Sequence, residues 1–231
     1  MNDNWLLGDL APECLEFLNE HVHKKSIAAG EILFEEGAPV QNLIFPIDGM
    51  VSVQCSTQDG RHAEVFAMGR DGAIGAHYLL GLRRFPCYAV TVISGRAIWI
   101  PVAAFLDAIE RFPCVVPALN ACLLRVFSRM AQNVLCASHH SAPQRIANWI
   151  LHAQDRVERE SFDLTQRALS DILGLRSATV SEAYNRLLSA GAIQHSRGNL
   201  QVVDREVLHS LACECYDQTH LDCLRKVGAA R

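Results

Sequence analysis

Short apolar runs separated by glycines occupy much of residues 30–100, and they constrain the fold more than any other feature of the sequence. The runs cover residues 32–34, 43–47, 50–55, 64–68, 89–93 and 97–100. Turn residues separate many of them at intervals of about 8 to 12 residues, which is typical of an antiparallel sandwich or small barrel. Asp48-Gly49 and Asp59-Gly60 are predicted hairpin turns, because glycine adopts positive φ at little cost. We therefore predict an all-β domain, preceded by a short helix over residues 12–21.

The periodicity changes at Val102, where apolar residues begin to follow the repeat of a helix. Residues 118–141 contain neither proline nor glycine, which predicts one long helix. Along it, a seam of mostly apolar residues recurs at alternating intervals of four and three, as in a coiled coil. The seam consists of Leu119, Leu123, Val126, Met130, Asn133 and Ala137. We predict that this seam joins two copies of the chain; packing of the helix on its own β-domain is the alternative.

Pro143 interrupts the helical pattern two residues after Ser141, and we predict that a second domain begins there. A helix over residues 144–157 is predicted to bury Ile146, Trp149 and Ile150. The short segment after it, around Phe162, is expected to be extended.

The following residues, 164–193, carry the pattern with the clearest functional meaning. Thr165 is a natural N-cap residue, and Gly174 can adopt the positive φ that ends a short helix. A second helix is predicted after it, with short or polar residues in its first turns and an apolar side formed by later ones. This pattern predicts a helix-turn-helix, in which the first turns of the second helix approach base edges in the major groove. An ordinary helical hairpin with solvated arginines is the alternative.

A β-hairpin is predicted over residues 191–203, with its tip at residues 197–199, and it would form a wing beside the second helix. The formal net charge of the chain is −4, which by itself does not indicate a nucleic-acid-binding protein. Residues 165–198, however, contain four arginines and only two acidic residues. Any phosphate-binding surface is therefore expected in this segment.

Most of the predicted DNA-binding residues fall into two groups. Thr179 is also predicted to bind DNA but is assigned to neither group. The expected base-proximal side chains are Arg176, Ser177, Ser181, Glu182 and Asn185. Phosphate contacts, which position the protein without specifying sequence, are expected from Thr165, Gln166, Arg186, His195, Ser196 and Arg197.

The order of β-domain, long helix and winged helix-turn-helix, with its densest match in residues 168–187, resembles the Crp/Fnr family of bacterial transcription regulators. The resemblance implies an α+β fold: an N-terminal cyclic-nucleotide-binding-like β-barrel (a double-stranded β-helix or jelly roll), a long dimerisation helix and a C-terminal winged helix-turn-helix. It also implies a homodimer that binds a two-fold symmetric operator in double-stranded DNA and contacts RNA polymerase. Ala178 and Glu182 stand where better-studied members carry a glutamate and an arginine, so the usual half-site of the family is not expected.

These expectations divide the chain into four parts. Residues 1–112 form an effector-type domain with flanking helices, and residues 113–141 the dimerisation helix and hinge. Residues 142–208 form the DNA-binding domain, and residues 209–231 a helical tail.

The effector is not expected to be a cyclic nucleotide. Responsive relatives carry Gly-Glu and, about ten residues later, Arg-Ser/Thr-Ala, whose glutamate and arginine hold the ribose and the phosphate. Here Ala76 follows Gly75, and the second element is replaced by residues 85–88, Phe-Pro-Cys-Tyr. We predict a different effector or none. The residues nearest to such a site are Gly75, Arg83, Arg84 and Cys87, the two arginines being either a displaced anion contact or solvated loop residues.

No metal or other cofactor is predicted. Cys14, Cys55 and Cys87 are too dispersed for the N-terminal iron–sulfur cluster of oxygen-sensing relatives. Haem on His77 is an alternative, as are redox-active thiols. Placed on one C-terminal helix, the cysteines and histidines of residues 209–223 would not converge on a tetrahedral centre. These residues are His209, Cys213, Cys215, His220 and Cys223.

The other features of the sequence argue against competing functions. The nine irregularly spaced cysteines are typical of reduced thiols, and neither a secretory signal nor a long apolar span is present, so a cytoplasmic location is expected. We find no pattern of a nucleophile, a phosphate-binding glycine loop or an acid–base pair, so an enzyme is not predicted. A cupin-like enzyme would have to use His62, Glu64 and His77. A sensor module whose helix-turn-helix contacts protein, and a redox-responsive regulator acting through its thiols, are the alternative functions.

Overall fold

The structure is a computed structural model of the 231-residue chain, and it describes residues 1, 3–196 and 198–219. The chain divides into two compact units, one formed by Met1–Val53 with Ala67–Val126 and the other by Gln54–Phe66 with Phe127–Arg231. No helix among the described residues is long and apolar enough to cross a membrane.

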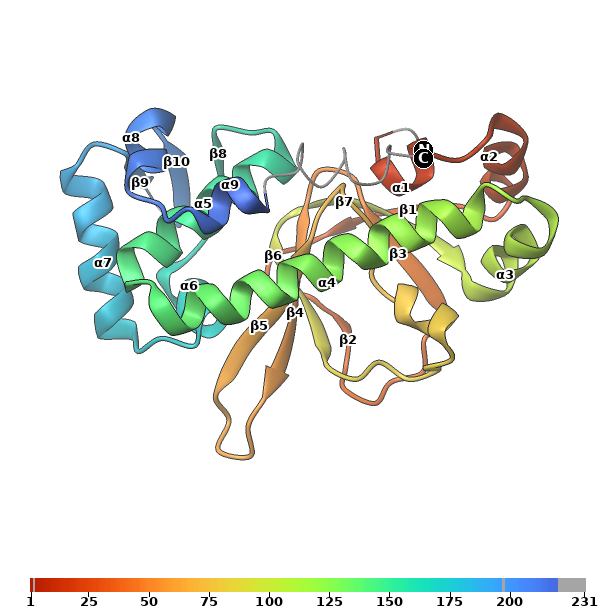
Figure 1. Ribbon diagram of the computed structural model, residues 1–231, viewed down its shortest axis with the longest axis horizontal. Helices are drawn as coiled ribbons and strands as arrows, with labels where there is room; N and C mark the ends of the chain where they lie inside the picture. Colours follow the sequence, from red (N-terminus) through yellow and green to blue (C-terminus); the bar gives the residue numbers. More distant parts are fainter. Residues whose placement is uncertain (2, 197, 220–231) are drawn as a thin grey trace. The chain divides into compact units, whose positions relative to one another are not determined.

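Two antiparallel sheets are built from the strands in the first half of the chain (Figure 1). One has the order β1-β7-β3 and comprises His23–Ile27, Gly95–Pro101 and Asn42–Pro46. The other has the order β2-β6-β4-β5 and comprises Ile32–Phe34, Tyr88–Ile93, Met50–Ser56 and His62–Met68. Each of the six predicted runs overlaps one of these strands. Strand β1 was not predicted, because four of its five residues are exposed and its sequence, HKKSI, lacks an apolar run.

A close approach between two loops explains two of the glycines. A Cβ atom at Gly95 would lie 2.4 Å from the backbone nitrogen of Gly49, which is closer than any side chain allows. Asp48 closes the same corner by accepting hydrogen bonds from Arg96, one from its backbone amide at 2.6 Å and one from Nε at 2.8 Å. The Asp48-Gly49 turn therefore connects β3 to β4 while touching the start of β7.

Short helices surround the strands of the first unit. They are α1 (Trp5–Gly8), α2 (Pro12–Asn19), the 3-10 helix η1 (Ala76–Leu80) and α3 (Val102–Arg111). Asn4 caps α1 and donates from Nδ2 to the carbonyl oxygens of Pro46 and Gly72, both at 2.9 Å. This buried amide ties the N-terminal segment to two loops of the β-domain.

The predicted long helix is α4, which spans Val115–His139 (Figure 1, green). It begins three residues before the predicted start because Pro117 lies in its first turn, where a proline costs no intrahelical hydrogen bond. In the first unit its buried side includes Val115, Ala118 and Cys122. Arg125 is also buried there and donates from Nε to the backbone oxygen of Asp71 at 3.2 Å.

The second unit is a helical domain with a small sheet. Its helices after α4 are α5 (Ala142–Val157), α6 (Gln166–Leu173), α7 (Ser177–Ser189), α8 (Arg205–Ser210) and α9 (Cys215–Gln218). The strands Ser161–Asp163, Ile193–Ser196 and Asn199–Val202 form a sheet in the order β8-β10-β9. Helix α5 is the centre of this core, since every residue from Ile146 to Ala153 is buried.

The outer part of the β4–β5 hairpin belongs to the second unit. Trp149 of α5 donates from Nε1 to the Glu64 carboxylate, at 3.2 and 3.4 Å from its two oxygens. Asn133 of α4 donates from Nδ2 to the backbone oxygen of Val65 at 3.1 Å. Glu64 is therefore a structural acceptor for α5.

Candidate nucleic-acid interface

Local residues determine where the first helix of the helix-turn-helix, α6, begins and ends. The hydroxyl of Thr165 accepts a hydrogen bond from the backbone amide of Ala168 at 3.1 Å, so it caps α6 as predicted. Gly174 ends α6 with φ +61°, the left-handed conformation that glycine adopts most easily. The turn is further held by Arg145 of α5, whose Nη2 donates to the backbone oxygen of Leu173 at 2.7 Å.

Helix α7 has one buried side and one exposed side. Val180, Ala183 and Leu187 are buried as predicted, and Tyr184 joins them. The exposed side contains most of the predicted DNA-binding residues of this helix and its N-cap. These are Arg176, Ser177, Thr179, Glu182, Asn185 and Arg186, while Ser181 is half-buried beside them.

The N-terminus of α7 is suited to approach an anionic polymer. Arg176 is its N-cap residue, with extended φ and ψ, and no side chain caps the helix. The first backbone amides of α7 are therefore directed outward with the positive end of the helix dipole, which favours phosphate oxygens. Ser177, Ala178 and Thr179 are small enough to let another molecule come close.

Two exposed ion pairs modulate the positive charge of this surface. Arg186 Nη2 lies 2.9 Å from Glu182 Oε1 on α7, and Arg167 Nε lies 3.2 Å from Asp171 Oδ2 on α6. Exposed pairs one helical turn apart contribute only about 0.3 to 0.5 kcal/mol. Arg186 can therefore exchange Glu182 for a phosphate at small cost.

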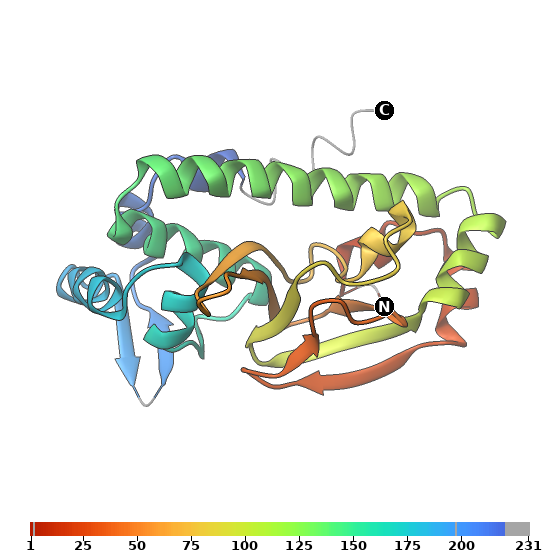
Figure 2. The same ribbon diagram turned by 90° about the horizontal axis from the view of Figure 1, so that it is seen from below.

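The predicted wing is present as the β9–β10 hairpin, which projects beside α7 (Figure 2, blue). Ser196 pairs with Asn199 at its end, and His195 and Ser196 are exposed, whereas Arg197 lies outside the described residues. The ring of His195 meets that of Tyr184 edge-on, with centroids 5.8 Å apart. This contact joins the outer part of the wing to α7.

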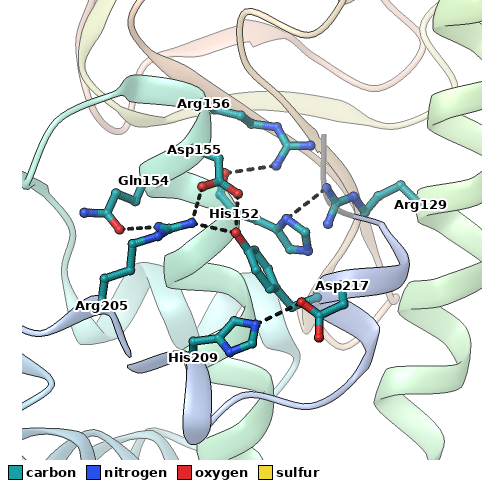
Figure 3. A network of polar contacts seen from close by, with 9 residues as sticks. Arg129, His152, Gln154, Asp155, Arg156, Arg205, His209 and Asp217 are labelled. Carbon is teal, nitrogen blue, oxygen red and sulfur yellow. Dashed lines mark hydrogen bonds and ion pairs between the residues drawn. The ribbon is translucent and has the colours of Figure 1, made fainter. Parts of the chain in front are cut away.

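A polar network connects α8 and α9 to α5 (Figure 3). Asp155 accepts from Arg205 Nη2 at 2.7 Å and from the Tyr216 hydroxyl at 2.9 Å, and Arg205 also donates to that hydroxyl at 2.6 Å. Burial, with Asp155 beside it, raises the pKa of Tyr216. Sequence reasoning did not find this network, because its members lie on three separate helices.

The C-terminal segment differs from the continuous helix assumed in the sequence analysis. Helix α8 ends at Ser210, and α9 begins only at Cys215, because Cys213, Cys215 and Tyr216 all enter the core and the chain must turn between them. His209 and Cys213 are consequently not neighbours on one helix, and His209 Nε2 lies 2.9 Å from Asp217 Oδ1 instead. His220 and Cys223 lie outside the described residues.

Cys213 and Cys215 meet Cys136 of α4, which sequence reasoning treated as packing, and His140, the residue after α4, which it passed over. Cys136 Sγ is 3.6 Å from Cys213 Sγ, and His140 Nδ1 is 3.4 Å from Cys215 Sγ. The hydrogen bond with Cys136 lowers the pKa of Cys213 and raises that of Cys136. The available signal was the spacing of Cys136 and His140, which places them one turn apart on a helix.

In the β-domain, two of the four predicted effector residues have structural roles. Gly75 has φ +93°, and Arg84 donates from Nη1 to the backbone oxygen of Gly37 at 2.7 Å. Arg83 is exposed and Cys87 is half-buried. Phe85, at the position of the second cassette element, is buried and stacks on Phe34 with centroids 4.9 Å apart.

His77 of η1 packs edge-on against this aromatic pair, 4.8 Å from the Phe85 centroid. Burial lowers the pKa of His77. Phe85 thus lies in an apolar cluster with Phe34 and His77.

Helix α4 uses part of the predicted seam inside the chain. Leu119 is buried in the first unit, and the Asn133 amide is engaged by Val65 in the second. The exposed apolar side chains of α4 belong mainly to a neighbouring stripe. They are Val116, Leu124, Phe127, Met130, Val134 and Leu135, of which only Met130 was in the predicted seam.

Comparison with known families defines the class of protein to which this arrangement belongs. The cyclic nucleotide-binding domain profile matches residues 24–112, and the Crp-like helix-turn-helix domain profile matches residues 144–211. A domain of the first type followed by one of the second defines a DNA-binding regulator with a sensor-type β-domain. The chain belongs to the Crp/Fnr family of transcription regulators.

Relatives and solved structures agree with this assignment. The nitrogen fixation regulation protein FixK of Bradyrhizobium diazoefficiens is 22% identical over 85% of this chain and 84% of its own length. A CRP-like cAMP-activated global transcriptional regulator of Mycobacterium tuberculosis is 24% identical over 85% of this chain and 91% of its own. The structure of FixK2 from Bradyrhizobium japonicum has a TM-score of 0.70 at 19% identity, covering 83% of this chain and 98% of that one.

The predicted α+β fold class is confirmed by these matches: a nucleotide-binding-like β-sheet domain, helices and a C-terminal helix-turn-helix. Among the described residues, the strands of the β-domain form two sheets and do not close into a barrel. The matching relatives are transcription regulators and not enzymes, as the sequence predicted.

Proposed function

We propose that the protein acts as a homodimer on a two-fold symmetric operator in double-stranded DNA, with α7 in the major groove and the β9–β10 wing on the phosphate backbone. The observation that carries the proposal is the exposed first turn of α7, where Arg176 and Ser177 lead a helix whose opposite side is packed into the core. Two such helices in a dimer would read two half-sites.

The roles of the individual side chains follow from their positions. Arg176, Ser177, Ser181, Glu182 and Asn185 approach base edges, and Thr165, Gln166, Arg186, His195 and Ser196 approach phosphates. Arg197, which lies outside the described residues, is assigned to a phosphate from the sequence alone. Glu182 can accept a hydrogen bond from cytosine N4, whereas an arginine would prefer guanine. The operator should therefore differ from those of relatives with arginine at this position.

The dimer contact of this proposal is the exposed stripe of α4 rather than the seam expected from the sequence. Phe127 is 68% exposed and Val134 is 69% exposed, and they lie two helical turns apart on one face. Large apolar side chains in a row on a helix surface are typical of an interface, and a second copy of α4 would cover them. This is a coiled-coil arrangement in which both chains contribute the same stripe.

The effector of the proposed regulator is not a cyclic nucleotide. Ala76 and Phe85 supply neither the carboxylate nor the guanidinium for such a ligand, and the Phe34–Phe85 stack supports the same conclusion. The CRP-like relative of Mycobacterium tuberculosis is described as cAMP-activated, so this chain would differ from it in its signal. Contact with RNA polymerase and a cytoplasmic location are part of the proposal, because a regulator of this family works on the chromosome.

In vitro selection of DNA sequences by the full-length protein tests the proposal. We expect an inverted repeat whose two half-sites are separated by about one helical turn. The Arg176→Ala variant should bind this site more weakly by about 1 to 3 kcal/mol and relax the sequence preference. Arg61→Ala, which removes an exposed arginine from the β4–β5 turn, is the matched control and should bind normally.

The absence of any enriched sequence at low salt would overturn the proposal. An equal loss of affinity for random and selected DNA in Arg176→Ala would overturn the assignment of this residue to a base edge and make it a phosphate contact.

A further inference from the structure

Three cysteines and a histidine converge in the second unit, away from the exposed side of α7. The ligand atoms of Cys136, His140, Cys213 and Cys215 all lie within 4.8 Å of one another. Cys136 lies in the last turn of α4 and His140 directly follows this helix. Cys213 lies between α8 and α9, and Cys215 is the first residue of α9. The three cysteines are buried, and the His140 side chain is 12% exposed.

The spacing of these atoms matches a single tetrahedral ion. Zinc bonds of about 2.3 Å to sulfur and about 2.0 Å to nitrogen place two sulfurs about 3.8 Å apart, and a sulfur and a nitrogen about 3.5 Å apart. The Cys136 and Cys213 sulfurs are 3.6 Å apart, and Cys215 Sγ is 3.4 Å from His140 Nδ1. The backbone therefore already brings the four groups to coordination distance.

The groups around the cluster are those that orient zinc ligands. His140 directs Nδ1 to the cluster, while its other nitrogen, Nε2, lies 3.2 Å from Glu214 Oε1. A carboxylate on the distal nitrogen fixes the tautomer and raises the basicity of a ligating histidine. Asn148 of α5 is 8% exposed and directs Nδ2 to Cys213 Sγ at 3.4 Å and Cys136 Sγ at 3.7 Å. Such N–H donors stabilise thiolates.

We propose that Cys136, His140, Cys213 and Cys215 bind one zinc ion in a closed structural site that fastens the C-terminal end of α4 to the segment between α8 and α9. The complete set of four protein ligands is typical of structural zinc and leaves no position for a substrate. The site is separate from the proposed DNA-binding surface and from the predicted effector residues of the β-domain. This proposal replaces the expectation from the sequence that the chain holds no metal.

Two other uses of the same residues fit less well. An iron–sulfur cluster distributes its ligands over several irons, whereas these four ligand atoms all lie within 4.8 Å of one another. A disulfide between Cys136 and Cys213 would shorten their separation from 3.6 Å to about 2.05 Å and would engage only two of the four residues. The disulfide would not explain the orientation of His140 or its contact with Glu214.

The position of the site suggests what zinc would do for the regulator. Helix α4 carries the proposed dimer stripe, and the segment that contains Cys213 and Cys215 lies between two helices that pack on α5. Zinc would therefore link the end of the dimer helix to the scaffold that supports α6 and α7. Its withdrawal should loosen that scaffold while leaving the β-domain unchanged.

Metal analysis of full-length protein without an affinity tag, expressed with zinc in the medium, is the first test. We expect about one zinc per chain in the wild type. Cys136→Ser and His140→Gln should each lose at least nine-tenths of it. Cys55→Ser, which changes an exposed cysteine outside the cluster, is the matched control and should retain zinc.

A spectroscopic test on the wild type remains valid if a ligand variant fails to fold. Chelator-treated protein titrated with Co²⁺ under anaerobic conditions should show the intense visible absorption of four-coordinate cobalt and a thiolate charge-transfer band. His140→Cys should keep the metal, with the visible bands shifted by the change from nitrogen to sulfur.

The proposal is overturned by wild-type protein that contains no zinc and gives only the weak spectrum of six-coordinate cobalt. It is also overturned if Cys136→Ser binds either metal as the wild type does. Neither readout depends on DNA, so failure here is distinct from failure of the proposed operator binding.

Discussion

Removal of the Asp155 carboxylate should destabilise the second unit strongly. The Asp155 side chain is 10% exposed and accepts hydrogen bonds from Arg205 and Tyr216 (Figure 3). In Asp155→Asn, an amide N–H₂ group would replace one of the two carboxylate oxygens and would face a donor, from either Arg205 or Tyr216. A hydrogen bond to a charged group contributes about 1.5 to 3 kcal/mol, and because the Arg205 side chain is 42% exposed, water compensates part of the loss. We expect the free energy of unfolding to fall by about 2 to 3 kcal/mol.

Urea denaturation followed by Trp149 fluorescence measures this change. Trp5→Phe and Trp99→Phe in the background leave Trp149, the single tryptophan of the second unit, as the reporter. With a slope of about 1.5 kcal/mol/M, the midpoint should fall by about 1.5 to 2 M. Tyr216→Phe, which removes only the hydroxyl, should cost about 1 kcal/mol. The double variant should cost less than the sum of the two, since both remove the same contact.

The control is Glu206→Gln, an exposed carboxylate in the first turn of α8, which should shift the midpoint little. If Asp155→Asn unfolds at the same urea concentration as this control, the network does not stabilise the unit and the reasoning is refuted. Strict additivity of the two substitutions would show that Asp155 and Tyr216 act independently.

Three further outcomes are expected. Phe127→Asp should convert the dimer to monomers in sedimentation equilibrium, whereas Leu80→Asp, on an equally exposed leucine of η1, should not; a persistent dimer would place the interface elsewhere. Gly174→Ala should lower stability by about 1 to 2 kcal/mol in thermal melts, because φ +61° disfavours a Cβ atom, and an unchanged melting temperature would contradict this. Cyclic AMP should leave the melting temperature of the protein unchanged, and a concentration-dependent increase would show that the Phe85 region admits a nucleotide.

The sequence predicted the elements whose signals are local. The six apolar runs appear as strands, and the polar first turns and apolar later positions of α7 appear as its exposed and buried sides, because periodicity alone determines which side chains can share a face. Strand β1 was missed, because edge pairing with β7 and not apolar content makes it a strand. Helix α1 was missed as well, being only four residues long.

The proposed dimer stripe shows a limit of the same method. Both the predicted seam and the exposed stripe of α4 have helical spacing, and they differ by a rotation of about one residue. Leu119 and Asn133 of the seam are engaged inside the chain, whereas Met130 and Ala137 are exposed, and the contacts of the first two depend on segments far away in the sequence.

Local order in the sequence determined the helix-turn-helix, its wing and the absence of a cyclic-nucleotide cassette, since each is contained within a few tens of residues. Only the tertiary structure brought Cys136 and His140 close to Cys213 and Cys215. Cys136 and Cys213 are 77 positions apart in the sequence. The physical reason is that a binding site requires convergence in space. The sequence predicted a continuous helix after α8. The chain bends there instead, and this bend turns Cys213 and Cys215 toward α4.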